Sequence, residues 1–96
     1  MTKNSVIKIL RKFKEENQAR YKLLRIGLFG SYARNEAVSE SDIDIVVELS
    51  HPDMYIMGDI KYDLEKIYNC DIDVIRLREK MNSVLKEKIE KEAVFV

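Results

Sequence analysis

Residues 22–49 read KLLRIGLFGSYARNEAVSESDIDIVVEL, and two apolar segments within this stretch decide the fold. Residues 22–29 form a nearly continuous apolar run, which is typical of a strand covered on both faces. The run stops at Gly30, and we expect a short helix to follow from Ser31, then the polar loop NEAVSES. Residues 42–48, DIDIVVE, are rich in β-branched residues and place Ile43, Ile45 and Val47 at every second position, which predicts a second strand.

Outward from these strands, hydrophobic periodicity predicts three longer helices and one more strand. Apolar residues recur at helical spacing over residues 5–16 and 54–68, and alternation predicts a strand over residues 71–76. Residues 83–92 are predicted to form the last helix. The resulting order is α-β-α-β-α-β-α, which indicates an α+β fold in which helices pack on a small three-stranded mixed sheet.

The same patterns predict which side chains cap or fill the structure. Asp53 is a candidate N-cap, and Asn69 can end the following helix in a left-handed conformation. Met54 and Met57 fit the apolar stripe of that helix. Val84, Leu85 and Ile89 are expected to point inward from the last helix, and Cys70 is most simply a small buried residue.

Composition limits the class of protein. A chain of 96 residues with 46% hydrophobic residues predicts a single globular domain over residues 1–96. We see no apolar run of the roughly 20 residues that span a membrane, and no signal peptide. The single cysteine excludes an internal disulfide and a thiolate zinc cluster. These features favour a cytoplasmic protein that does not bind membranes.

Charge is unevenly distributed along the chain. Residues 1–25 carry a net charge of +6, residues 26–75 carry −8, and residues 76–96 carry +2. An acidic centre is the opposite of what a duplex-binding protein needs, so direct nucleic-acid binding is not predicted. It does suit divalent cations.

Four aspartates define the candidate chemistry. Asp42 and Asp44 share one face of their predicted strand, because side chains alternate with period two. Asp71 and Asp73 share a face of the third strand in the same way. If these strands are neighbours, three or four carboxylates crowd one patch, and all-oxygen ligands favour Mg²⁺, Mn²⁺ or Ca²⁺ over zinc. A single Asp-x-Asp pair is more often simply solvated or caps a turn.

A second feature lies upstream of these carboxylates. Gly30-Ser31 follows a buried strand at an expected helix start, where backbone N–H groups and a hydroxyl can converge on a phosphate. Alone, such a pair is more often a plain turn with Ser31 as the N-cap. Opposite an acidic metal cluster, it predicts that a triphosphate is bound and oriented.

These motifs together resemble a known family. Gly30-Ser31, ten residues, and then Asp42-Ile43-Asp44 resemble the signature of the DNA polymerase β-type nucleotidyltransferase superfamily. The fuller string GSYARNEAVSESDIDIVVEL resembles its minimal nucleotidyltransferase (MNT) branch, and the similarity extends from about residue 25 to residue 96. The resemblance implies a polymerase β palm-like fold made of the one domain.

The resemblance also implies roles for individual residues near the bend. Gly30 and Ser31 match the positions that grip nucleotide phosphate, and Arg34 matches a position that steadies the loop or reaches phosphate. Asn35 departs from the branch, which usually has glycine there. Asparagine is the next most tolerant residue at positive φ, so we expect the turn to survive.

The aspartates acquire implied roles in the same way. Asp42 and Asp44 match the ligands of two Mg²⁺ ions, with Mn²⁺ as a substitute. Asp73 matches the third carboxylate, which contacts one metal and helps to deprotonate the attacking hydroxyl. Asp71 has the right parity but precedes the usual position, so we assign the role to Asp73.

The implied reaction is transfer of AMP from ATP to a hydroxyl, with release of pyrophosphate. MNT proteins are commonly paired with a HEPN-domain toxin, so the resemblance implies an antitoxin that adenylylates a toxin tyrosine within a hetero-oligomer. One alternative is a non-catalytic antitoxin that masks its partner by binding it. Another is an aminoglycoside-type nucleotidyltransferase, although those enzymes usually carry an added helical domain.

Overall fold

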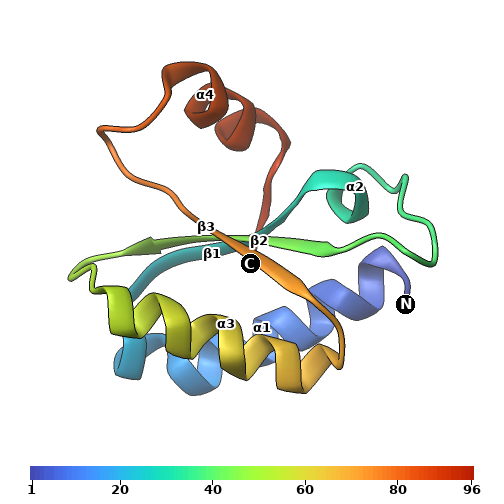
Figure 1. Ribbon diagram of the computed structural model, residues 1–96, viewed down its shortest axis with the longest axis horizontal. Coiled ribbons are helices and arrows are strands. Elements are labelled where there is room, and N and C mark those ends of the chain that lie inside the picture. Colours follow the sequence, from blue (N-terminus) through green and yellow to red (C-terminus); the bar gives the residue numbers. More distant parts are fainter.

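A mixed four-stranded sheet organises the protein, and the computed structural model describes all residues from 1 to 96 (Figure 1). The strands lie in the order β3-β2-β1-β4. The elements in chain order are α1 (Lys3–Tyr21), β1 (Leu23–Phe29), α2 (Gly30–Ala33), β2 (Ile43–Leu49), α3 (Met54–Tyr68), β3 (Ile72–Arg76), α4 (Ser83–Glu92) and β4 (Val94–Phe95).

Strand directions confirm a mixed sheet. The pairs β1–β2 and β1–β4 are antiparallel, and β2–β3 is parallel. The expected count of three strands is wrong, because β4 adds a fourth strand beside β1. A two-residue strand is too short to show periodicity in the sequence. Its position depends on Gly27, where a Cβ atom would lie 2.9 Å from the Val94 carbonyl oxygen and prevent this close pairing.

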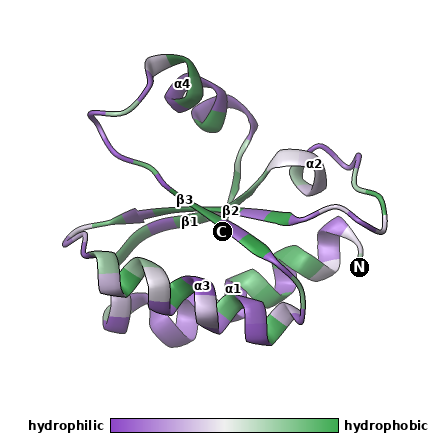
Figure 2. Cartoon of the chain, in the orientation of Figure 1, coloured by the Kyte–Doolittle hydropathy of each residue, from purple (hydrophilic) through white to green (hydrophobic).

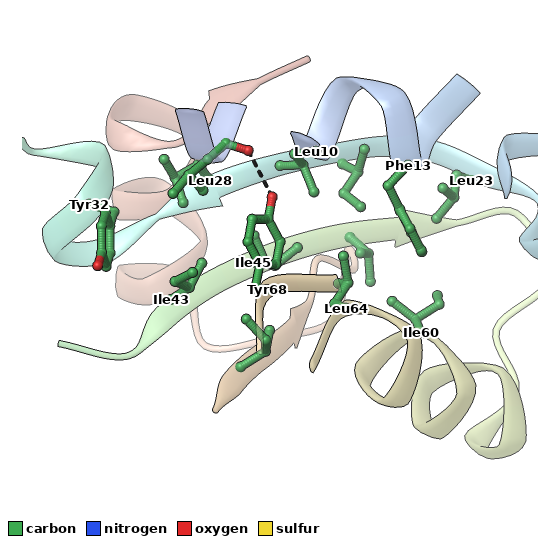
Figure 3. Close-up of a cluster of buried hydrophobic side chains, with 14 of the residues drawn as sticks. Leu10, Phe13, Leu23, Leu28, Tyr32, Ile43, Ile45, Ile60, Leu64 and Tyr68 are labelled. Carbon is green, nitrogen blue, oxygen red and sulfur yellow. Dashed lines mark hydrogen bonds between the residues drawn. The ribbon is translucent and has the colours of Figure 1, made fainter. Parts of the chain in front are cut away.

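The two faces of the sheet are covered differently. Helices α1 and α3 cover one face, where Ile43 and Ile45 join the main core with Leu10 and Leu64 (Figures 1 and 3). Helix α4 lies on the opposite face, where Val46 belongs to a smaller apolar cluster. Hydrophilic and hydrophobic residues are interspersed along the helices (Figure 2), and no helix combines the length and apolar character needed to cross a membrane.

The helix ends follow local sequence signals. Helix α1 is longer than the predicted 5–16, because Thr2 and Ser5 form a capping box and polar residues extend it to Tyr21. The prediction for this helix followed its apolar residues alone, so it missed the polar turns at both ends. Helix α3 begins and ends as predicted: Asp53 Oδ1 accepts a 2.7 Å hydrogen bond from the Tyr55 N–H, and Asn69 has φ of 54°.

Three of the burial predictions are wrong. Met54 is 89% exposed and Val84 is 74% exposed, and Cys70 is exposed in the turn before β3. At about 100° per residue, Met54 lies about 120° around the helix from the buried Ile60, and Val84 lies about 140° from the buried Ile89. Both residues recur at roughly helical spacing with buried residues, but they lie too far around their helices to face the sheet.

Candidate active site

Strand pairing brings two of the predicted aspartates side by side. In the parallel β2–β3 ladder, Asp44 is the register partner of Asp73. Register partners on neighbouring strands project from the same face of a sheet. This face is opposite to the one that buries Ile43 and Ile45. The expected adjacency of the two Asp-bearing strands is therefore present, and it places Asp73, not Asp71, beside Asp44.

The Gly30 bend closes over the same carboxylate. Phe29, at the end of β1, is the register partner of Asp44 on the other side of β2. Gly30 follows with φ of +73°, a left-handed conformation that L side chains rarely adopt. A Cβ atom on Gly30 would lie 3.0 Å from Asp44 Cγ and closer still to Oδ2. Glycine is required here both by the backbone conformation and by the packed carboxylate.

The pKa of Asp44 is raised by burial and by other acidic groups that lie close to it. Burial raises the pKa of the Asp44 carboxyl, and Asp73 raises this pKa further by its charge and by side-chain hydrogen bonding. The charge of Asp42 acts in the same direction, whereas the Arg34 guanidinium lowers the pKa of Asp44. Two predicted carboxylates and one predicted cation thus act on Asp44 at one end of the sheet.

The arrangement is not a closed metal cage. Asp42 is exposed just before β2, and no three Asp, Glu, His or Cys side chains are positioned together to hold a metal ion. The donor set nevertheless fits Mg²⁺, because it offers carboxylate oxygens and no nitrogen or sulfur. A divalent cation between Asp44 and Asp73 would relieve the repulsion that raises the pKa of Asp44. The metal-ligand roles of Asp42, Asp44 and Asp73 stay predictions.

Helix α2 carries the residues that the sequence predicts to face phosphate. It consists of four residues, Gly30–Ala33, so Phe29 and not Ser31 is its N-cap. Ser31 lies in its first turn, where backbone N–H groups have no acceptor within the helix. Arg34 ends the helix, and its Nε lies 3.5 Å from Glu36 Oε2. Asn35 has φ of 60°, which confirms that asparagine adopts the left-handed conformation that this turn requires.

Neighbouring residues have structural roles that the sequence only partly indicated. Tyr32, which follows the Gly30 bend, is buried in the main core. Glu48, on the same strand as Asp44, accepts a 2.9 Å hydrogen bond from Arg25 Nε. The sequence analysis did not place Cys70 near the site. Although this residue is exposed, partial desolvation of its thiol raises the thiol pKa, and the charges of Asp71 and Asp42 raise it further. Its position directly before Asp71 was the available signal.

Comparison with protein families tests the resemblance. The family model for the nucleotidyltransferase domain matches residues 10–96 of this chain. The chain belongs to the nucleotidyltransferase domain family. A relative from Methanocaldococcus jannaschii, named "Putative protein adenylyltransferase", is 38% identical to this nucleotidyltransferase over 98 residues, which cover 99% of this chain and 98% of the relative.

Solved structures confirm the fold of this nucleotidyltransferase. A toxin–antitoxin crystal structure with AMP-PNP superposes with a TM-score of 0.71 at 28% identity, covering 99% of this chain and 72% of the other. A second structure contains a tri-AMPylated Shewanella oneidensis HEPN toxin in complex with an MNT antitoxin. It superposes with a TM-score of 0.62 at 29% identity, covering 97% of this chain and 66% of the other.

Proposed function

We propose that this nucleotidyltransferase transfers AMP from ATP to a tyrosine hydroxyl of a HEPN-domain toxin and thereby acts as its antitoxin. The observation that carries the proposal is the β2–β3 register, which sets Asp44 beside Asp73 directly under the Gly30 bend. Relatives named as protein adenylyltransferases and a neighbouring structure of an AMPylated HEPN toxin with an MNT antitoxin support this choice of donor and acceptor.

Different residues of the chain have different roles in the proposed reaction. The first-turn N–H groups of α2 and the Ser31 hydroxyl bind phosphate oxygens, and Gly30 lets this turn pack against the Asp44 carboxylate. Asp42 and Asp44 would hold Mg²⁺, which when bound supplies charge neutralisation of the triphosphate and activation of the acceptor hydroxyl. Arg34 adds a positive charge near these carboxylates.

The chemical step is a displacement at the α-phosphorus of ATP. The tyrosine oxygen forms a bond to this phosphorus, and the bond to the bridging oxygen breaks, so pyrophosphate leaves with the bonding electrons. The tyrosine proton passes to the Asp73 carboxylate, which lies beside Asp44 on the same face of the sheet. The product is a tyrosyl-AMP ester on the toxin.

A transfer assay tests the proposal. The protein is incubated with α-labelled ATP, Mg²⁺ and its HEPN partner, and the label retained on the partner is measured by mass spectrometry and autoradiography. We expect Asp44→Asn and Asp73→Asn to abolish labelling, because each removes a carboxylate from the site. Asp71→Asn is the matched control, since this exposed aspartate precedes β3 and should leave labelling intact.

Three outcomes would contradict the proposal. If the toxin is bound and neutralised by both wild type and Asp44→Asn while no label is retained, the protein is a binding antitoxin. If the label appears on an aminoglycoside-type small molecule and not on the toxin, the acceptor class is wrong. A tyrosine-to-phenylalanine toxin variant that still accepts AMP would specifically exclude tyrosine as the acceptor.

A further inference from the structure

The outward face of α3 carries an apolar surface that the fold itself does not use. Met54, Tyr55 and Tyr62 are 89%, 85% and 60% exposed, and Gly58 lies exposed between them. At about 100° per residue, these four positions fall within an arc of about 100°, centred opposite to the buried Ile60. They therefore form one continuous stripe directed away from the core, which we name the α3 stripe.

Gly58 is the second observation that marks the α3 stripe as a contact surface. Glycine is a poor helix former, and Gly58 lies within α3 with a helical neighbour on each side. A Cβ atom built at this position would meet nothing within 4 Å, so no packing inside this chain requires glycine. A missing side chain on an exposed helix face does allow a second helix to approach closely, because the distance between helix axes depends on the side chains at the contact.

The α3 stripe is complementary to itself about Gly58. When two copies of α3 cross antiparallel at Gly58, a residue n positions before it faces the residue n positions after it on the other copy. Met54 then faces Tyr62, a thioether–aromatic contact, and Tyr55 faces Lys61, a cation–π contact. Each contact occurs twice, as a two-fold axis requires. Lys66 Nζ already lies 5.3 Å from the centre of the Tyr62 ring.

We propose that a second copy of this chain docks on the α3 stripe and forms a two-fold symmetric dimer centred on Gly58. The contact lies away from the candidate active site. The stripe begins at the end of α3 that follows β2, whereas Asp44 lies near the start of β2, on the face of the sheet opposite to α3. Both sites in the dimer therefore remain open to nucleotide and to a protein acceptor.

The exposed area predicts a weak dimer. An aromatic side chain buries about 150–250 Å². With Tyr55 85% and Tyr62 60% exposed, the tyrosines of two copies contribute roughly 450–700 Å². Met54 adds to this area, but the total stays near or below the roughly 1,200 Å² at the lower limit of stable interfaces. We therefore expect concentration-dependent association and not a permanent dimer.

Sedimentation velocity with the full chain, from about 1 to 500 μM, tests the proposal. We expect the wild type to shift from monomer to dimer across this range, and Gly58→Leu to remain monomeric because the new side chain separates the helices. Gly58→Leu should not unfold the monomer, since the space at Gly58 is open. Tyr62→Ala should weaken association at least tenfold. Ala19→Leu, which adds the same side chain at an exposed position of α1, is the matched control and should dimerise like the wild type.

A wild type that stays monomeric at 500 μM would overturn the proposal, as would a Gly58→Leu variant that dimerises like the wild type. If Gly58→Leu instead loses binding of the HEPN toxin while the isolated wild type is monomeric, the stripe belongs to the toxin, and the dimer is excluded. None of these outcomes depends on AMP transfer, so this proposal can fail while the proposed function stands.

Discussion

Replacing Gly30 by alanine tests the central geometric claim about the site. Two separate costs are expected. Alanine at φ of +73° is strained, and left-handed backbone costs an L residue about 1–2 kcal/mol. The new Cβ atom would also lie 3.0 Å from Asp44 Cγ, so the Asp44 side chain must leave its position. An off-rotamer side chain costs about 0.5–1.5 kcal/mol.

The sum is a loss of about 1.5–3.5 kcal/mol in the free energy of unfolding. For a domain of roughly 100 residues, each kcal/mol corresponds to a change in Tm of about 4–8 °C, so Tm should fall by at least about 6 °C. Urea denaturation and calorimetry measure the two quantities. Displacement of Asp44 should also abolish AMP transfer, at temperatures where the variant is still folded.

Two comparisons separate the parts of this loss. Gly58→Ala is the matched control, because the same change in an open helical position should stabilise the protein by about 0.8–1 kcal/mol. In an Asp44→Ala background, Gly30→Ala should cost less, since the displaced carboxylate is gone. If Gly30→Ala costs under about 0.5 kcal/mol, or the same amount with and without the Asp44 carboxylate, the proposed packing of the bend is incorrect.

Three further predictions concern charge and hydrogen bonding. Asp44→Asn should raise the free energy of unfolding at pH 7, measured by urea denaturation. Burial and Asp73 raise the pKa of the Asp44 carboxyl and so oppose its charged form, which asparagine lacks. An unchanged or lower stability would contradict the crowding of carboxylates around Asp44. Burial and the Asp63 hydrogen bond raise the pKa of Tyr21 to about 12. The stability that the protonated Tyr21 hydroxyl contributes should therefore be complete below pH 10 and be lost as pH rises through 12. Tyr21→Phe should flatten that alkaline loss of stability. The hydrogen bond from Arg25 lowers the pKa of Glu90. The stability contributed by the charged Glu90 carboxylate is therefore present above the unfolded pKa of about 4.5 and is lost as pH falls through the lowered pKa. Arg25→Ala should remove that acid dependence of stability and increase amide exchange in α4.

Local sequence determined much of this protein. The β-branched residues at every second position of 42–48 predicted β2, and Asp53 and Asn69 predicted both ends of α3, because capping and side-chain period depend only on neighbouring residues. The spacing of Gly30-Ser31 and Asp42-Ile43-Asp44 indicated the nucleotidyltransferase family, which the family match confirms. The candidate carboxylates were likewise visible in the sequence as two Asp-x-Asp pairs.

Only the tertiary structure decided how these parts meet. Whether β2 and β3 are neighbours, and whether Asp73 or Asp71 aligns with Asp44, depends on register between segments almost 30 positions apart, which no local pattern specifies. The fourth strand exists because Gly27 leaves room for a two-residue segment from the far end of the chain. The exposure of Met54 also depends on where the sheet lies relative to the helix, and periodicity describes the helix alone.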